Sequence, residues 1–168
     1  LSSRRQLPVY SPLSAEAITE ACRRSAADRE CGRRKLSRLL RRRYGVEEVH
    51  LTDSGTGALR LALEAAPRPA GSPVALPAYS CYDLVSAAVG ADVPVVFYDL
   101  APTTLQPELG SLVRAVQAGA RVVVVAPLFG IPVDWARVRD ALNGRSVTFV
   151  EDAAQGHGSL WIDRPVGS

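Results

Sequence analysis

Apolar residues gather in four short runs in the second half of the chain, and these runs predict buried strands. The runs cover residues 74–76, 93–98, 122–126 and 147–150. They are rich in valine and lack polar alternation, which is typical of strands covered on both faces. The stretches between them, residues 82–89, 107–118 and 133–142, have helical periodicity instead. The alternation predicts an α/β fold, a three-layer α-β-α sandwich around a mostly parallel sheet.

The first 45 residues carry a different pattern, which predicts amphipathic helices. An extended lead-in over residues 7–13 precedes Ser14, a candidate N-cap, and Gly32 is expected to interrupt the helical pattern. The apolar stripe that follows consists of Leu36, Leu39, Leu40 and Tyr44. Arginines occupy the opposite face, and Gly45 ends the helix. We therefore divide the chain into an N-terminal helical segment, residues 1–45, packed against another surface, and an α/β domain, residues 46–168.

The turn Asp53-Ser-Gly-Thr-Gly57 lies between a predicted strand, residues 49–52, and a predicted helix, residues 58–66. This order presents backbone N–H groups and a helix N-terminus to an anion, with the Ser54 and Thr56 hydroxyls beside them. A phosphate fits there, although a plain capped turn is an alternative. Arg60 stands where a dinucleotide fingerprint has its third glycine, and no Gly-Lys-Ser/Thr follows. A nucleotide-binding domain is thus the weaker interpretation.

Polar residues follow the last apolar run directly, at Asp152 and Gln155. Taken alone, Asp152 is explained as a cap of the turn after the strand, with Glu151 solvated. The carboxyl ends of parallel strands share one edge of a sheet, however, and ligands bind in open α/β sheets at that edge. The segments 54–56, 77–82, 127–130 and 152–155 all follow predicted strands and are expected to meet there.

Composition and charge narrow the possible partners. The 168 residues are 47% hydrophobic, and no apolar run approaches the roughly 20 residues of a membrane span or the core of a signal peptide. We expect a cytoplasmic protein with no membrane partner. Most cations lie before Gly45 among acidic residues and without interleaved aromatics, so a solvated helix face is favoured over a nucleic-acid patch. Cys22, Cys31 and Cys81 lack metal-ligand spacing and are expected to be reduced.

Four motifs in order resemble those of the DegT/DnrJ/StrS sugar aminotransferases, which are fold-type-I enzymes that use pyridoxal 5′-phosphate. Ser54-Gly-Thr-Gly-Ala-Leu59 is similar to the family's Ser-Gly-Thr-x-Ala-Leu, and Pro77-Ala-Tyr-Ser80 to its Pro-Ala-Tyr-Thr. Val95-Val-Phe-Tyr-Asp99 is similar to Pro-Val-Phe-x-Asp. Glu151-Asp-Ala-Ala-Gln-Gly-His-Gly158 is similar to Glu-Asp-Ala-Ala-Gln-x-His-Gly. The resemblance covers roughly residues 7–168 and implies the large domain of an aspartate-aminotransferase-like enzyme.

The resemblance also implies roles for individual residues. Asp152 corresponds to the carboxylate that pairs with the protonated pyridine nitrogen of the cofactor, and Gln155 to the residue that hydrogen-bonds its 3-oxygen. Ser54, Gly55 and Thr56 correspond to the phosphate-binding turn. The implied activity transfers an amino group from a small-molecule donor, commonly glutamate, to a keto acceptor, commonly a nucleotide-linked sugar.

The sequence departs from the family's pattern in three respects. Cys81 stands where an aromatic ring usually stacks on the cofactor, and Tyr82 beside it is a candidate substitute for that contact. Pro127 replaces a common histidine. The only lysine, Lys35, lies far upstream of the position at which the family has its Schiff-base lysine, so no catalytic residue is assigned.

In the family that lysine follows Val-Gly-Ser, and this chain ends at Ser168. We therefore expect the N-terminal part of a large domain, truncated, inactive alone, and with sheet edges that favour a homodimer or other self-association. An alternative is a non-catalytic module that binds pyridoxal phosphate or serves assembly or regulation.

Overall fold

The computed structural model describes residues 14–23 and 29–168. The chain divides into two compact units, residues 1–39 and 40–168. The predicted extended lead-in, residues 7–13, lies outside the described residues. None of the helices that the structure describes has the length and apolarity needed to cross a bilayer.

The N-terminal helices largely follow the sequence pattern. Helix α1, Ala15–Arg23, starts as predicted after Ser14, whose Oγ accepts a hydrogen bond from the Ala17 N–H at 3.1 Å. Helix α2, Arg29–Tyr44, ends before Gly45, which has a φ of 65°. The predicted interruption at Gly32 is wrong, because α2 continues through it. A single glycine costs a helix only about 1 kcal/mol, which its neighbours can offset.

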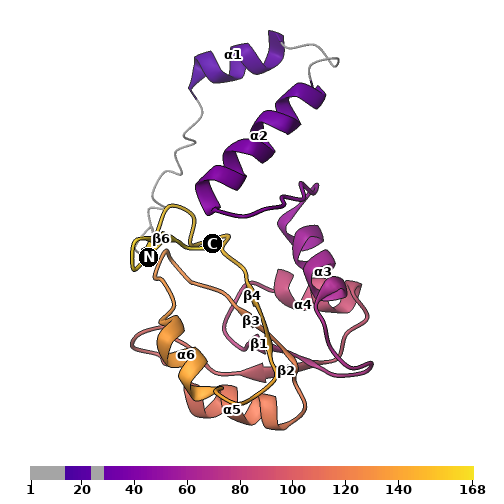
Figure 1. Ribbon diagram of the computed structural model, residues 1–168, viewed down its shortest axis with the longest axis vertical. Coiled ribbons are helices and arrows are strands. Elements are labelled where there is room, and N and C mark those ends of the chain that lie inside the picture. Colours follow the sequence, from indigo (N-terminus) through magenta and orange to yellow (C-terminus); the bar gives the residue numbers. More distant parts are fainter. Residues whose placement is uncertain (1–13, 24–28) are drawn as a thin grey trace, which may run out of the picture. The chain divides into compact units, whose positions relative to one another are not determined.

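A four-stranded parallel sheet forms the centre of the second unit (Figure 1). Its strands are β1 Val74–Pro77, β2 Val95–Tyr98, β3 Val122–Val125 and β4 Thr148–Glu151. The order across the sheet is β2-β1-β3-β4, so β1 and β3 are central and fully buried, while β2 and β4 are edges. All four strands confirm the predicted runs. The parallel pairing follows from the helices that connect each strand to the next.

Helices cover both faces of this sheet and complete the predicted three-layer sandwich (Figure 1). They are α3 Gly55–Ala65, α4 Asp83–Gly90, α5 Leu109–Gln117 and α6 Trp135–Ala141. Alternation along β3 decides the faces: Val122 and Val124 pack with α3 and α4, whereas Val123 and Val125 pack with α5 and α6. Each face therefore has its own apolar core, and the sheet is held between them.

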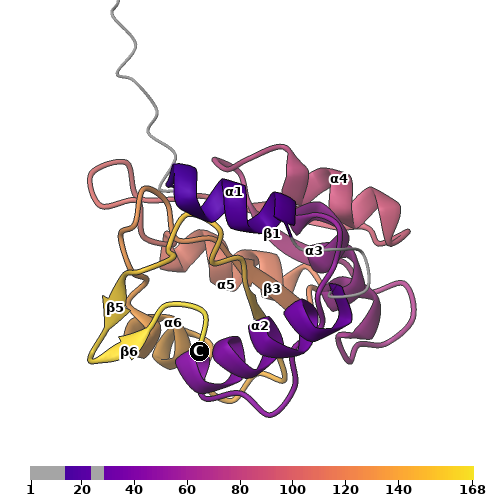
Figure 2. The ribbon, with the colours of Figure 1, turned by 90° about the horizontal axis from the view of Figure 1, so that it is seen from above.

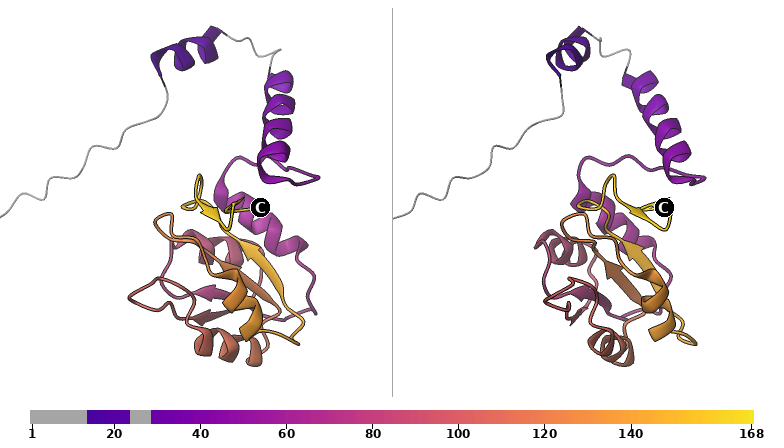
Figure 3. Two further views of the ribbon diagram at one scale, coloured as in Figure 1. Left: turned by 60° about the vertical axis from the view of Figure 1, so that its left-hand side comes forward. Right: turned by 90° about the vertical axis from the view of Figure 1, so that its left-hand side faces the viewer.

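Two features differ from the sequence-based expectation. Residues 49–52 form no strand in the described part of the chain, because the apolar pattern supplies only a preference and no sheet neighbour pairs with them. After β4 the chain forms an unpredicted antiparallel hairpin of β5, Leu160–Trp161, and β6, Arg164–Pro165 (Figure 3). Its two turn residues, Ile162 and Asp163, have φ angles of 44° and 62°.

Candidate functional site

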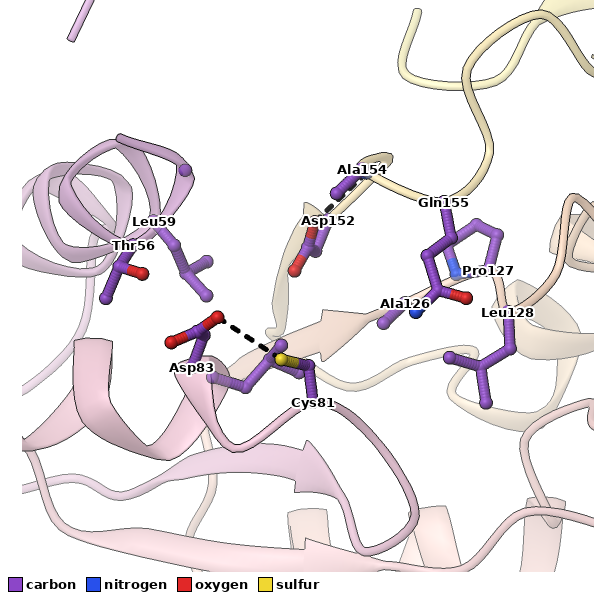
Figure 4. Close-up of a pocket in the computed structure, with 12 residues that line it drawn as sticks. Thr56, Leu59, Cys81, Asp83, Ala126, Pro127, Leu128, Asp152, Ala154 and Gln155 are labelled. Atoms are coloured by element: carbon purple, nitrogen blue, oxygen red, sulfur yellow. Dashed lines mark hydrogen bonds between the residues drawn. The ribbon is translucent and has the colours of Figure 1, made fainter. Parts of the chain in front are cut away.

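A cavity of about 220 Å³ opens at the carboxyl end of the sheet (Figure 4). The chain leaves β1 toward β2 on one side, and β3 lies on the other side of β1. Such a reversal leaves a crevice outside the strand ends, where ligands bind in open α/β sheets. The lining comes from the start of α3 and from the segments after β1, β3 and β4. The four segments predicted to meet at this edge therefore do meet.

The N-terminus of α3 supplies free backbone donors to the cavity. Ser54 is the N-cap, and its Oγ accepts a hydrogen bond from the Gly57 N–H at 3.0 Å. The Ala58 N–H donates to the Ser54 carbonyl. Gly55 and Thr56 line the cavity, and their N–H groups are first-turn donors without a helical acceptor. Together with the Thr56 hydroxyl and the helix dipole, they form an arrangement that attracts an anion.

A carboxylate enters the cavity from the end of β4. The Asp152 N–H donates to the Val125 carbonyl at 2.9 Å, which continues the sheet pairing beyond the strand. Its Oδ1 accepts a hydrogen bond from the Ala154 N–H at 3.1 Å, so the capping role expected of an isolated aspartate is present. Its Oδ2 has no hydrogen-bond donor among the described residues and is available to a ligand in the cavity.

The amide of Gln155 is oriented by the loop after β3. The Phe129 N–H donates to Gln155 Oε1 at 3.0 Å. Since a backbone N–H needs an oxygen acceptor, this contact assigns the amide orientation and leaves the Nε2 hydrogens as donors. Phe129 and Gly130 have positive φ angles of 55° and 77°, which bring this loop back toward Gln155. Figure 4 shows Gln155 on the side of the cavity formed by Pro127 and Leu128.

A second carboxylate, which the sequence analysis did not single out, comes from the start of α4. Asp83 lines the cavity, and its Oδ2 lies 3.2 Å from Cys81 Sγ, which donates to it. The available signal was an acidic residue in the first turn of a predicted helix that follows a strand end. Among the described lining residues there are two carboxylates and no lysine, arginine or histidine. Any attraction of the cavity for an anion therefore comes from backbone N–H groups, the Thr56 hydroxyl and the helix dipole rather than from basic side chains.

Five of the seven predicted site residues line this cavity: Gly55, Thr56, Cys81, Asp152 and Gln155. Ser54 lies next to it with its hydroxyl engaged in the cap of α3. Tyr82 lies outside the cavity lining and is 77% exposed, so the structure offers no stacking contact from its ring. The part that the structure describes contains no group of His, Cys, Asp and Glu that could hold a metal, and its three cysteines are free thiols.

Fold and cavity together define a class: an α/β protein with a helix N-terminus and a carboxylate beside one cavity at the carboxyl edge of a parallel sheet. The comparisons give the family. The model of the DegT/DnrJ/EryC1/StrS aminotransferase family matches residues 12–168, and the chain belongs to this family. Its fold is that of the fold-type-I enzymes that depend on pyridoxal phosphate.

Curated relatives share about three residues in ten with the chain. L-glutamine:2-deoxy-scyllo-inosose aminotransferase of Streptomyces kanamyceticus is 29% identical over 83% of this chain and 33% of its own length. The protein of the same description from Streptomyces lividus is 31% identical over 86% of this chain and 34% of its own length. The chain thus spans about a third of the length of the curated relatives it matches.

Solved structures of other proteins have a similar fold. The sugar aminotransferase CalS13 from Micromonospora echinospora matches 68% of this chain and 33% of its own with 29% identity and a TM-score of 0.60. 3-Amino-5-hydroxybenzoic acid synthase matches 97% of this chain and 44% of its own with a TM-score of 0.82, at 22% identity. The second likeness shows the architecture alone.

Proposed function

We propose that this chain supplies the cofactor-binding part of a pyridoxal-phosphate-dependent aminotransferase. The observation that carries the proposal is the cavity at the strand-order reversal, which joins the α3 N-terminus to Asp152 and Gln155. Family membership supports it. A structure of GDP-4-keto-6-deoxymannose-3-dehydratase with bound hydrated pyridoxal phosphate, 20% identical with a TM-score of 0.71, shares the fold.

The residues present fit this group at both of its charged ends. Gly55 and Thr56 offer N–H donors and a hydroxyl to a phosphate dianion. The free Oδ2 of Asp152 would accept a hydrogen bond from a protonated ring nitrogen, and the Nε2 of Gln155 would donate to a ring oxygen. When bound, the cofactor supplies a ring that withdraws electrons from the carbon next to an amino group.

Asp152 would hold the proton on the ring nitrogen, because an ionised carboxylate stabilises a positive charge beside it in a half-buried site. The Ala154 N–H fixes the carboxylate through Oδ1 and so aims Oδ2 into the cavity. Phe129 does the same for Gln155 through Oε1. Leu59, Leu84 and Leu128 line the remaining wall with apolar surface and would exclude water from one side of a bound ring.

The names of the relatives suggest the amino donor and the keto acceptor. The curated relatives include aminotransferases for scyllo-inososes that are named for L-glutamine. Another is named for dTDP-4-dehydro-2,3,6-trideoxy-D-glucose. We therefore propose a small amino donor and a polyhydroxylated cyclic ketone as the substrates of the whole protein.

Pyridoxamine 5′-phosphate tests the cavity directly, because it has no aldehyde to react with Lys35 or the chain's amino terminus. Titration by calorimetry should show saturable binding. Asp152→Asn should weaken that binding by roughly tenfold or more, since a neutral amide replaces the ionised partner of the ring nitrogen. Pyridoxamine without its phosphate should bind more weakly than the phosphorylated form.

Asp140→Asn is the matched control, because Asp140 is an exposed aspartate on α6 that does not line the cavity. Thermal unfolding of each variant shows whether the fold is intact. Equal affinity of the wild-type chain, Asp152→Asn and Asp140→Asn would remove Asp152 from the proposed site. Equal affinity for the two pyridoxamines would remove the phosphate assignment at α3.

A second candidate, binding of the cofactor without catalysis, is favoured by one observation: no lysine lines the cavity among the described residues. Borohydride reduction after incubation with pyridoxal phosphate distinguishes the two. A stable adduct at one site beside the cavity would reject the non-catalytic candidate, whereas reversible binding without such an adduct supports it.

We further propose that the protein acts in the cytoplasm and self-associates as a homodimer. The edge strand β4 pairs only with β3 among the described residues, and an unpaired parallel edge favours association. Light scattering after gel filtration gives the mass in solution. A monomer over a wide range of concentration would contradict the dimer, and recovery of the native protein in a membrane fraction would contradict the location.

A further inference from the structure

A second cavity, of about 400 Å³, lies between helix α6, strand β4 and the β5–β6 hairpin. Figure 2 shows the hairpin beside α6. Aromatic side chains of Trp135, Phe149 and Trp161 line it, and Arg139 and Arg164 bring two guanidinium groups to the same space. The lining has no residue in common with that of the first cavity.

Local structure places each arginine next to a tryptophan. Trp135 and Arg139 are four residues apart on α6 and so share a helix face; the Arg139 Cζ lies 5.6 Å from the Trp135 ring centroid. Trp161 and Arg164 are directly opposite each other in the hairpin register, which puts them on one face of the ribbon. Two arginine–tryptophan pairs, one from a helix and one from a hairpin, thus face one cavity.

No ion pair joins Arg139 or Arg164 to a carboxylate in the part of the chain that the structure describes. The one side-chain carboxylate in the lining, Glu151, uses both oxygens: Oε1 accepts from Trp135 Nε1 at 3.3 Å, and Oε2 accepts from the Gly167 N–H at 2.7 Å. Neither guanidinium is paired with a carboxylate of a described residue, and the formal charge of the lining side chains is positive, because two arginines face one glutamate.

We propose that this second cavity binds a flat organic anion, an aromatic or heteroaromatic ring that carries a carboxylate or a phosphate. The ring would pack between the indole and phenyl faces, which offer a large apolar area with specific stacking geometry. The anionic group would receive paired N–H donors from a guanidinium, the arrangement in which arginine recognises carboxylates and phosphates. The rings of Trp135 and Phe149 already pack edge to face, with their centroids 5.5 Å apart, so part of this wall is preformed.

Intrinsic fluorescence reports on this cavity selectively. The chain has two tryptophans, and both line the second cavity, whereas none lines the first. Benzoate, phenyl phosphate and uncharged benzamide serve as probes, added to the full 168-residue chain in the absence of cofactor. At least one of the two anions should cause a saturable change in tryptophan emission, and benzamide should bind roughly tenfold more weakly or not at all.

The double variant Arg139→Gln with Arg164→Gln should weaken binding of the anion by roughly tenfold or more. Arg137→Gln is the matched control, because Arg137 is exposed on the same helix, outside the cavity lining, and its loss removes the same charge. It should leave the affinity within about twofold of the wild type. Circular dichroism during thermal unfolding checks that each variant is folded.

Three results would overturn the proposal: no saturable response to either anion, equal affinity for benzamide, or equal loss in the control and the double variant. A response to benzoate alone supports the proposal with a carboxylate ligand, and a response to phenyl phosphate alone supports it with a phosphate ligand. Calorimetry with the better probe gives the stoichiometry, which should be one per chain.

Discussion

The two cavities are built around consecutive residues, the last of strand β4 and the one that follows it, yet their chemistry is opposite. Asp152 enters the first cavity, whose described lining has two carboxylates and no basic side chain. Glu151 enters the second, which has two arginines and three aromatic rings. Successive residues of an extended chain point to opposite sides, so a Glu-Asp pair contributes to two sites. The pair Glu151-Asp152 should therefore be treated as two separate functional positions.

The two cavities also differ in how firmly the backbone holds them. The first lies on strand ends, a helix N-terminus and side chains that are fixed by backbone N–H groups. The second depends on a hairpin of two-residue strands, whose turn puts a β-branched isoleucine at a φ of 44°. A rigid scaffold suits a site that must orient a cofactor. We expect substitutions to alter the shape of the second cavity more easily than that of the first.

The largest effect is expected from Gly156→Ala, at the junction of the two cavities. A Cβ on Gly156 would lie 2.5 Å from Val166 Cγ1 and 3.5 Å from Pro127 Cβ, and these neighbours line the second and first cavities respectively. Since both are buried, the substitution should cost about 2 kcal/mol of unfolding free energy and weaken ligand binding in both cavities.

Urea unfolding and the two titrations measure this effect. Gly32→Ala is the control, because Gly32 lies inside helix α2 and a Cβ there meets nothing within 4 Å. This substitution should leave the free energy of unfolding unchanged or raise it. If Gly156→Ala lowered the ligand affinity of only one cavity, the two cavities would be less coupled through this loop than the contacts indicate.

A smaller loss is expected from Tyr98→Phe, in the core outside both cavities. The buried Tyr98 hydroxyl donates to the Val124 carbonyl at 2.8 Å, and its removal should cost about 1 kcal/mol. Burial also raises the pKa of Tyr98 above its ordinary value near 10. The neutral phenol is the form the fold prefers, so this contribution is complete below about pH 10 and is lost as the pH rises beyond it.

Denaturant unfolding between neutral and alkaline pH tests this. The wild type should lose more stability above pH 10 than Tyr98→Phe, while both should bind ligands equally at neutral pH. Identical alkaline profiles would show that Tyr98 does not contribute to the pH dependence.

Ile162→Asn should stabilise the β5–β6 hairpin, which forms one wall of the second cavity. A two-residue hairpin turn with positive φ at both positions favours Asn-Gly or similar pairs, and a β-branched residue is strained there. Ile162 is 73% exposed, so little packing is lost, and the free energy of unfolding should rise by about 1 kcal/mol. Hydrogen exchange of the hairpin amides should slow while the first cavity is unchanged. Faster exchange would contradict the strain.

The smallest effect is expected from Asp83→Asn in the first cavity. Removing one of two negative charges should tighten binding of the pyridoxamine 5′-phosphate dianion by roughly threefold, and the gain should shrink at high salt. The amide oxygen can still accept the Cys81 thiol hydrogen bond, so stability should change little. Weaker binding would show that Asp83 instead assists the ligand.

The sequence by itself determined the layers, the strands and five of the residues that line the first cavity. Apolar runs without polar alternation, separated by stretches of helical periodicity, predict a parallel sheet. The residues that follow each run mark the edge of the sheet at which a ligand binds. It did not determine the pairing of residues 49–52 or the hairpin, since both depend on which neighbours are available in space.

Only the tertiary structure separated Glu151 from Asp152, moved Tyr82 away from the cavity and brought Asp83 into it. It also joined Trp135 and Arg139 to Trp161 and Arg164, which lie more than twenty residues apart and share no sequence motif. The physical reason is the same in each case. Local preferences act within a few residues, whereas a cavity is formed by side chains whose positions are fixed by strand order, register and the path of loops between them.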